Sequence, residues 1–470
     1  MSVSVIILAA GAGSRMRSAC PKVLHQICGK AMLAYSIEEA LKISDDVHIV
    51  LFFQAAQIQQ YITDTFSQHS AHITLHYQNH SKYPGTGGAL MDNKDNGDNK
   101  DNGGDIQGTM KGDIGDNKEE KSPFAMRYDK VLILNGDMPL ITKEALQPLL
   151  KSQSPIALGV FELENPTGYG RVIIQEGQIT QIIEEKDAQE AIKAIKTINA
   201  GVYALDQAIL ATYLPKLSCH NAQNEYYLTE LIALAARDKI SIEPIALNPK
   251  NFMGVNTQSE LASVQDMMLD TLRKKAMDQG VVMHLPHTIY LEAQVCFEGA
   301  CEIEMGVAIK GKSHIIDSHI KAHTIIEDST IKDSHIGPLA HIRPKCAITK
   351  SHIGNFVEVK ASHLDGVKAG HLSYLGDCEI SEGSNVGAGV ITCNYDGKTK
   401  HKTIIGKNVF IGSDTQLVAP LNIASNVLIA SGTTMTKDAK EGDLVLSRVR
   451  QENKSAGFWH FFKKDIAKDS

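Results

Sequence analysis

Three features that mark other classes of protein are missing from this sequence or scarce in it. The chain holds eight cysteines, but no two have the C-x-x-C spacing of a zinc site or a redox pair. No apolar run reaches the roughly 20 residues that cross a bilayer. Positive charge is not in excess, since the formal net charge is -7, whereas binding the phosphate backbone of nucleic acid requires clustered Lys and Arg. We therefore expect reduced thiols, no membrane partner and no nucleic-acid partner.

The apolar run near the start of the chain, Val5 to Ala10, has no basic residue before it. A secretory signal peptide would have one. The run leads directly into Gly11-Ala12-Gly13, which favours a first buried strand followed by a glycine-rich turn. We therefore expect a cytoplasmic protein.

The first half of the chain alternates short strand-like runs with longer helix-like stretches. The length of 470 residues predicts more than one domain, because a domain usually holds about 100 to 200 residues. From residue 3 to about 255, the alternation predicts an α/β domain with a mostly parallel sheet. The clearest strand-like runs are Val3–Leu8, Val47–Phe52, Val131–Leu134 and Ile156–Phe161, and the clearest helix-like stretches are Leu33–Ile43 and Glu225–Ala236.

A low-complexity insertion interrupts this pattern at residues 92–122. It repeats Asp-Asn-Lys-Asp-Asn-Gly in tandem and carries nine acidic and five basic residues. Such a composition cannot bury a core, and the acidic residues lack the glycine and the closing Glu of an EF-hand loop. We interpret the segment as a solvated insertion rather than an acidic interaction loop or a metal site.

A connecting helix is predicted at residues 259–279, where apolar residues recur every three or four positions between Ser259 and Gly280. After it the hydrophobic period becomes six. Apolar residues follow one another at this step without a break from Ile405 to Met435. Hexapeptide repetition is typical of a parallel β-helix, in which each six-residue step forms one flat face of a coil.

Glycines follow the first predicted strand, where the backbone would approach a ligand phosphate closely. The stretch reads Leu8-Ala9-Ala10-Gly11-Ala12-Gly13-Ser14-Arg15-Met16 and is followed by Pro21-Lys22. Arg15, Lys22 and the start of a helix all suit an anion. The spacing is neither that of a P-loop nor that of the three-glycine dinucleotide fingerprint.

This stretch resembles the nucleotide-binding signature of sugar-1-phosphate nucleotidyltransferases, and Leu134-Asn135-Gly136-Asp137 resembles their metal-binding strand end. The wider resemblance is to the family of bacterial bifunctional UDP-N-acetylglucosamine pyrophosphorylases / glucosamine-1-phosphate N-acetyltransferases, and it covers nearly the whole chain outside the insertion. Further matching stretches are Gly168-Tyr169-Gly170-Arg171, Glu184-Glu185-Lys186, Ile198-Asn199-Ala200-Gly201, Gly254-Val255-Asn256, Arg343-Pro344, Asn355 to Lys360, Lys368 to Asp377 and Asn394-Tyr395-Asp396-Gly397.

The resemblance implies three parts and two activities. A Rossmann-like uridylyltransferase domain would occupy residues 1–258, a linker helix 259–279, and a left-handed β-helix with acetyltransferase activity 280–470. Acetyl transfer from acetyl-CoA to glucosamine-1-phosphate would give N-acetylglucosamine-1-phosphate. Uridylyl transfer from UTP would then give UDP-N-acetylglucosamine and pyrophosphate, for peptidoglycan and lipopolysaccharide synthesis. The β-helical domains of this family associate as trimers. We therefore expect a homotrimer with the acetyl-transfer site between subunits.

Uridylyl transfer brings two anions together, so a divalent cation and fixed positive groups must offset their charge. Asp137, at a strand end, suits Mg²⁺. The resemblance adds Asn256 as a second ligand and gives Arg15 and Lys22 catalytic roles beside the triphosphate. It assigns the uracil to Gln78, Gly85 and Thr86, the N-acetylglucosamine to Gly170, Glu184 and Asn199, and further substrate contacts to Leu8, Ala9, Ala10, Gly11, Asn135 and Gly136.

Acetyl transfer needs a base that takes a proton from the amine of glucosamine. His371 matches the base of the family, and either Asp377 or Glu379 could orient it. The resemblance assigns the sugar phosphate to Arg343, Lys360, Tyr374 and Asn385, an oxyanion-binding backbone N–H to Ala388, and acetyl-CoA to Asn394, Tyr395, Ser413, Ser431 and Arg448.

Two alternatives stay open at this point. The β-helix could serve only assembly or regulation of a monofunctional nucleotidyltransferase, or the chain could be a scaffold with decayed sites. The scaffold is disfavoured by the joint presence of six candidate site residues, Asp137, Asn256, Arg343, Lys360, His371 and Asn385. Release of CoA from acetyl-CoA would separate the bifunctional enzyme from the monofunctional one. His323 and His341, 18 residues apart, could stack as a metal pair, but we interpret them as solvent-facing or turn residues.

Overall fold

The computed structural model describes residues 2–91 and 124–462. The chain divides into two compact units, Met1–Met268 (unit 1) and Leu269–Ser470 (unit 2). The insertion predicted at 92–122 lies outside the described residues. Among the helices that are described, none is both long and apolar enough to cross a membrane.

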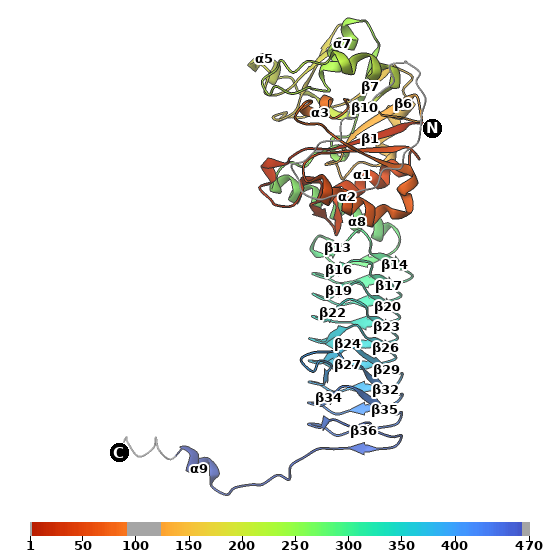
Figure 1. Cartoon of the computed structure of the whole chain (residues 1–470). Helices are drawn as coiled ribbons and strands as arrows, with labels where there is room; N and C mark the ends of the chain where they lie inside the picture. The colour runs from red at the N-terminus through yellow and green to blue at the C-terminus, as the bar shows by residue number, and fades with distance from the viewer. Residues whose placement is uncertain (1, 92–123, 463–470) are drawn as a thin grey trace, which may run out of the picture. The chain divides into compact units, whose positions relative to one another are not determined.

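Unit 1 is built on a mixed sheet with the strand order β11-β7-β10-β6-β1-β4-β5 (Figure 1). The first half of the chain is therefore α/β with a mostly parallel sheet, as the alternation predicts: β5, β4, β1 and β6 pair in parallel, as do β7 and β11, and β10 runs antiparallel to both of its neighbours. The strands are β1 (Ser4–Ala9), β4 (Val47–Leu51), β5 (Ile73–Tyr77), β6 (Lys130–Asn135), β7 (Ile156–Glu162), β10 (Thr197–Asp206) and β11 (Ile242–Ala246).

Alternation along the central strands creates two apolar cores, one on each face of the sheet. Val5 and Ile7 of β1 belong to one core, and Ile6 belongs to the other. The first face is covered by α1 (Met32–Leu41), α2 (Ala55–Phe66) and α4 (Lys143–Lys151), and the second by α6 (Gln207–Tyr213) and α7 (Glu230–Arg237).

All three predicted helices differ in their boundaries from the sequence prediction. The helix expected over Leu33–Ile43 is α1, which runs over Met32–Leu41. The helix expected over Glu225–Ala236 begins at Glu230, because the backbone of Tyr226 is bonded to the Pro84 carbonyl and the Gly87 N–H instead. The connecting helix, α8, runs over Gln258–Asp278. It begins one residue early because Thr257 and Glu260 form a capping box, with Glu260 N–H donating to Thr257 Oγ1 at 3.2 Å.

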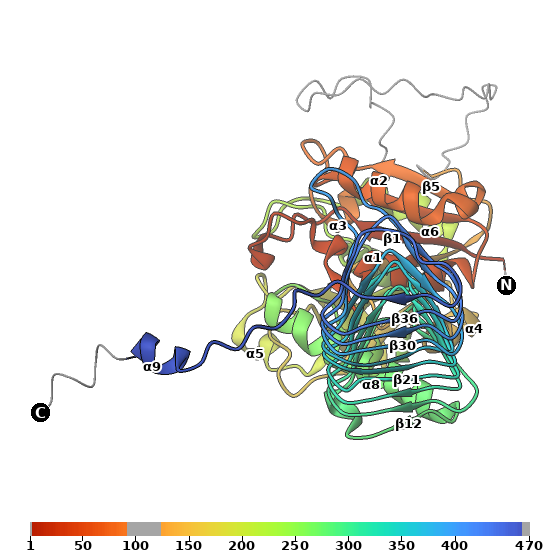
Figure 2. The same ribbon diagram turned by 90° about the horizontal axis from the view of Figure 1, so that it is seen from below.

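Unit 2 is a left-handed parallel β-helix, with three parallel sheets as its flat faces. The coils lie one above another when viewed along the stack (Figure 2). The hexapeptide positions fill the interior, since Ile411, Leu417 and Ile429 are each 0% exposed. Between β31 (Ile391–Cys393) and β32 (Thr403–Ile405) a loop interrupts the repeat.

The histidines of unit 2 follow the coil rather than the 18-residue spacing. His323 lies in a turn with φ 59°, and His341 pairs with Ile325, so the two do not share a register position. The histidines that are register partners on successive coils are His319, His335 and His352, whose ring centroids lie 5.8 and 6.4 Å apart with the planes at 71° and 50°. The described residues contain no group of three or more His, Cys, Asp or Glu side chains that could hold a metal ion.

Candidate active sites

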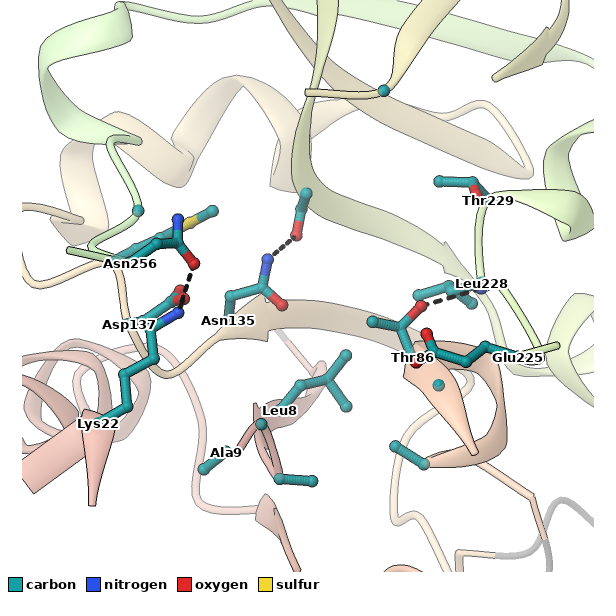
Figure 3. Close-up of a pocket in the computed structure, with 18 of the residues that line it drawn as sticks. Leu8, Ala9, Lys22, Thr86, Asn135, Asp137, Glu225, Leu228, Thr229 and Asn256 are labelled. Atoms are coloured by element: carbon teal, nitrogen blue, oxygen red, sulfur yellow. Dashed lines mark hydrogen bonds and ion pairs between the residues drawn. The ribbon is translucent and has the colours of Figure 1, made fainter. Parts of the chain in front are cut away.

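Unit 1 contains a cavity of about 580 Å³ at the carboxyl ends of β1 and β6, the edge at which α/β sheets bind ligands (Figure 3). Lys22, Asp137 and Asn256 meet at one end, and Thr86, Glu225, Leu228 and Thr229 form the opposite wall. The residues expected from the sequence that line it are Leu8, Ala9, Ala10, Gly11, Arg15, Lys22, Gln78, Gly85, Thr86, Asn135, Asp137, Gly170, Glu184, Asn199 and Asn256.

Gly136 differs from the other expected contacts. It is not part of the cavity wall: its N–H donates to the Leu8 carbonyl at 2.9 Å, and an added Cβ would lie 2.9 Å from Leu33 Cδ1. We therefore assign Gly136 to close packing between β1 and the turn after β6.

At the end of the cavity that holds Asp137 and Asn256, the positive side chains of Lys22 and Arg15 contact side-chain oxygens. Lys22 Nζ lies 2.5 Å from Asp137 Oδ2 and 2.7 Å from Asn256 Oδ1, and Arg15 Nη2 donates to that same Asn256 oxygen at 2.9 Å. Gly13 permits this approach, because its φ is 61° and an added Cβ would lie 2.6 Å from Lys22 Cβ. A carboxylate and an amide oxygen thus converge on one cation, the ammonium of Lys22.

At the opposite end, buried and partly buried polar side chains form two hydrogen-bonded pairs. Thr229 Oγ1 donates to Glu184 Oε1 at 2.9 Å, and Asn199 Nδ2 donates to Tyr203 Oη at 2.7 Å. Burial raises the pKa of the Glu184 carboxyl, while the Thr229 hydroxyl opposes this rise. Burial, followed by the charge of Glu184, raises the pKa of the Tyr203 phenol.

A third part of the wall comes from the loop after β5. Gln78 Nε2 donates to the carbonyls of Tyr83 and Gly85 at 2.8 and 3.0 Å, so the loop folds around the Gln78 amide. Gly85 has φ 93°, and an added Cβ would lie 2.7 Å from the Tyr226 carbonyl. Thr86 Oγ1 accepts from Leu228 N–H at 3.1 Å.

Sequence reasoning missed several residues of this wall. Phe52 and His80 stack with their centroids 4.4 Å apart and their planes at 9°, and both line the cavity. Thr229, Tyr169 and Glu225 line it as well. Only the matched stretch Gly168 to Arg171 pointed towards Tyr169; no motif or spacing marked the others.

In unit 2, four of the residues expected at the acetyl site form one polar cluster on the face of β25 (Glu358–Lys360) and β28 (Tyr374–Gly376). Lys360 Nζ lies 3.2 Å from Asp377 Oδ2, and Asn394 Nδ2 donates to the same carboxylate oxygen. Arg343 Nη1 lies 2.9 Å from Glu358 Oε1, which raises the pKa of the Arg343 guanidinium. Asn394 Nδ2 also lies 3.5 Å from Tyr374 Oη.

His371 ends strand β27 (Lys368–His371) and is exposed beside Asn355, its register partner. Neither of the two carboxylates considered from the sequence bonds to it within the described residues. Asp377 pairs with Lys360, and Glu379 pairs with Lys402, which lowers the pKa of Glu379.

The remaining residues predicted for the acetyl-transfer site are those for acetyl-CoA, with Ala388 as the oxyanion donor and Asn385 as a contact of the sugar phosphate. Arg448 Nη2 donates to the Ser431 carbonyl at 3.1 Å, and Gly432 N–H donates to the Ser413 carbonyl at 2.8 Å. The Ala388 carbonyl accepts from Asp414 N–H at 2.8 Å. The remaining two expected residues are Tyr395, 60% exposed in the loop after β31, and Asn385, which begins β30 (Asn385–Val386).

The fold and the cavity define a nucleotidyltransferase-type α/β unit joined, on one chain, to a hexapeptide-repeat β-helix. Residues 5–198 match the family described as the MobA-like NTP transferase domain. The chain belongs to the family of the bifunctional protein GlmU. It is 56% identical over 464 residues to that of Helicobacter hepaticus, covering 98% of each chain.

Two further relatives carry the same name. The chain is 52% identical over 462 residues to the bifunctional protein GlmU of Helicobacter pylori, covering 98% of this chain and 100% of that one. Identity to the protein of Wolinella succinogenes is 49% over 462 residues, covering 98% and 99%. The chain is thus a bifunctional acetyltransferase and uridylyltransferase of cell-wall precursor synthesis, as the sequence resemblance predicted, rather than a monofunctional nucleotidyltransferase or a scaffold.

Proposed function

We propose that the cavity of unit 1 is the uridylyl-transfer site and that the polar cluster of unit 2, with His371, belongs to the acetyl-transfer site. Uridylyl transfer is thereby assigned to residues 1–258, acetyl transfer to 280–470, and the connection to 259–279. The observation that carries the proposal is the convergence of Asp137, Asn256, Lys22 and Arg15 at one end of a cavity. The other walls hold the hydrogen-bonded pairs of Glu184 with Thr229 and Asn199 with Tyr203, and the loop that folds around the Gln78 amide.

The first end fits Mg²⁺, because its two side-chain oxygens already surround a cation. Asp137 and Asn256 would hold the ion, which would supply positive charge against the triphosphate. Arg15 and Lys22 add fixed positive charge beside the same oxygens, which favours the transition state of phosphoryl chemistry.

The other walls suit the two remaining parts of the substrate. Both hydrogens of the Gln78 amide are used inside the chain, so its Oε1 is the atom that would accept the N3–H of uracil. Glu184 and Asn199 would hold the hydroxyls and the acetamido group of N-acetylglucosamine, with Thr229 keeping the Glu184 carboxylate in place. Their burial strengthens each hydrogen bond to the sugar.

In unit 2, His371 would take the proton that the attacking amine loses. Arg343 and Lys360 would bind the phosphate of glucosamine-1-phosphate, exchanging their present carboxylate partners Glu358 and Asp377 for phosphate oxygens.

We further infer a cytoplasmic homotrimer. Its support is an exposed apolar column on one face of the β-helix: Phe410, Leu428 and Leu444 are register partners and are 52, 48 and 61% exposed. Contiguous exposed apolar residues mark surfaces that contact protein. Acetyl-CoA, UTP and the two sugar phosphates are the small-molecule partners.

The site assignment is tested by equilibrium binding of UDP-N-acetylglucosamine with Mg²⁺. Glu184→Gln and Gln78→Leu should each weaken binding about tenfold or more, whereas Glu243→Gln, on β11 and outside the cavity, should not. Equal affinity in all four proteins would move the site elsewhere.

The trimer is tested by the mass in solution. Leu428→Glu should give monomers that retain uridylyl transfer and lose acetyl transfer, because a buried unpaired carboxylate opposes association. Gln416→Glu, on the next face, is the matched control. A wild-type monomer with full acetyl transfer would contradict the trimer.

A further inference from the structure

Arg171 ends the matched stretch Gly168 to Arg171, yet the proposed function gives it no role. Its side chain is only 1% exposed although it carries a permanent charge. We propose that Arg171 is a positioning residue that fixes the wall binding the N-acetylglucosamine part of the substrate. This inference rests on the proposed function of that wall.

The guanidinium is held by three segments of the chain. Nη2 lies 2.7 Å from Glu185 Oε2, and Nη2 and Nε each donate to the Lys193 carbonyl at 3.3 Å. Nη1 donates to the Tyr169 carbonyl. A buried guanidinium is tolerated only where acceptors surround it in this way. Because its N–H groups lie in one plane and point in fixed directions, the guanidinium also fixes the directions of these acceptors relative to one another.

Each expected sugar contact is next in sequence to a group that Arg171 holds. Tyr169 precedes Gly170, Glu185 follows Glu184, and Ile198, the backbone register partner of Arg171, precedes Asn199. Asn199 N–H also donates to the Gly170 carbonyl at 2.9 Å. This bond links two of the expected sugar contacts directly.

The topology shows why a side chain is needed here. The hairpin of β8 (Arg171–Gln175) and β9 (Gln178–Ile183) joins the main sheet through a single residue pair, Ile198 with Arg171. The Arg171 side chain adds an ion pair with Glu185, just beyond β9, and hydrogen bonds to the carbonyl of Lys193, the last residue of α5 (Glu190–Lys193). The groups that would bind the triphosphate and the base lie on other elements, so loosening this junction should affect the sugar alone.

The test is steady-state kinetics of uridylyl transfer by the full chain. Arg171→Lys keeps the positive charge but replaces the planar guanidinium, which donates in several fixed directions, with a single ammonium group. We expect its KM for N-acetylglucosamine-1-phosphate to rise about tenfold or more, while its KM for UTP stays within about twofold. Arg273→Lys is the matched control, because Arg273 is a buried arginine of unit 2 that bonds Asp270 and the carbonyls of Ile289 and His287. Its two KM values should not change.

An equal rise of both KM values in Arg171→Lys, or no rise, would overturn the inference. Glu185→Gln keeps the arginine and should show the same selective rise to a smaller extent; if Arg171→Lys does not fold, an unchanged KM for the sugar phosphate in Glu185→Gln overturns the inference instead. Glu184→Gln separates the two proposals: if it raises that KM and Arg171→Lys does not, only the positioning role fails, and if neither does, the sugar site itself is wrong.

Discussion

Lys22 places its ammonium group between the two side-chain oxygens that we propose as ligands of the divalent cation in unit 1. Its Nζ lies within 2.7 Å of oxygens of both Asp137 and Asn256, and the Lys22 and Asp137 side chains are 11 and 20% exposed. Two cations cannot share these oxygens at such distances, because like charges repel strongly where water is largely excluded. The ammonium must therefore leave before a metal ion enters.

We expect Lys22→Met to bind Mn²⁺ more tightly than the wild type in the absence of nucleotide, by about three- to tenfold, because a competing charge is gone. Pyrophosphate release should nevertheless fall by about 100-fold or more, since a positive group beside the triphosphate is lost. Electron paramagnetic resonance of free Mn²⁺ measures the first quantity.

Lys30→Met is the control for this measurement, because Lys30 pairs with Glu38 and does not line the cavity. Weaker binding of Mn²⁺ by Lys22→Met than by Lys30→Met would contradict the competition between ammonium and metal.

Among single residues, the sequence indicated those that stand in a motif and carry charged or metal-binding side chains, such as Asp137 and Lys22. It could not locate Phe52 or His80, which reach the cavity only because β4 and the loop after β5 end side by side. It did not indicate that Gly136 packs against Leu33 and bonds the Leu8 carbonyl, because a packing glycine and a binding glycine look the same in a motif.

Strands β4 and β5, at the edge of the sheet in unit 1, share a pair of histidines, of which His48 is buried and His76 is partly buried. His48 Nδ1 lies 2.9 Å from His76 Nε2, and Phe124 packs edge-on against the His76 ring at 4.3 Å. Burial, followed by the charge of His48, lowers the pKa of His76 to about 4. The folded strand pair therefore favours a neutral His76 ring.

This shift predicts a pH dependence of the stability of β4 and β5. Between about pH 6.5, the pKa of an unfolded histidine, and about pH 4, the unfolded chain binds a proton that the folded chain does not. The free energy of unfolding should therefore fall as pH falls through this window, by about 3 kcal/mol at most. Hydrogen exchange of the β4 and β5 amides, corrected for intrinsic rates, measures it.

His76→Asn should remove most of this dependence, whereas His72→Asn, an exposed histidine that contacts the Asp45 carbonyl, should keep it. The same slope in His76→Asn as in the wild type would show that other groups titrate in this window.

The hexapeptide period of unit 2 was predicted correctly for the coil interior, because an apolar side chain every six residues has no other way to be buried. The register of the turns could not be predicted. His319, His335 and His352 follow one another after 16 and 17 residues, since tight turns shorten some coils. His323 and His341, which are 18 residues apart, therefore do not share a register position, and His323 lies in a turn, in agreement with the interpretation from the sequence.

For the whole molecule, the insertion at 92–122 is the segment whose composition argues against a contribution to either activity. Replacing it with a short Gly/Ser linker should leave both activities within about twofold and the melting temperature nearly unchanged, because loop-closure entropy changes slowly with length. Differential scanning calorimetry and the two activity assays measure this. A large loss of stability or of one activity would give the segment a function.

The central claim is that two separate sites on one chain perform the two transfers. It is tested most directly by assaying Asp137→Ala and His371→Ala for CoA release and pyrophosphate release on the same preparations. We predict that Asp137→Ala loses pyrophosphate release and keeps CoA release, and that His371→Ala does the reverse with an unchanged mass in solution. Loss of both activities in either folded variant, or survival of both, would contradict the account.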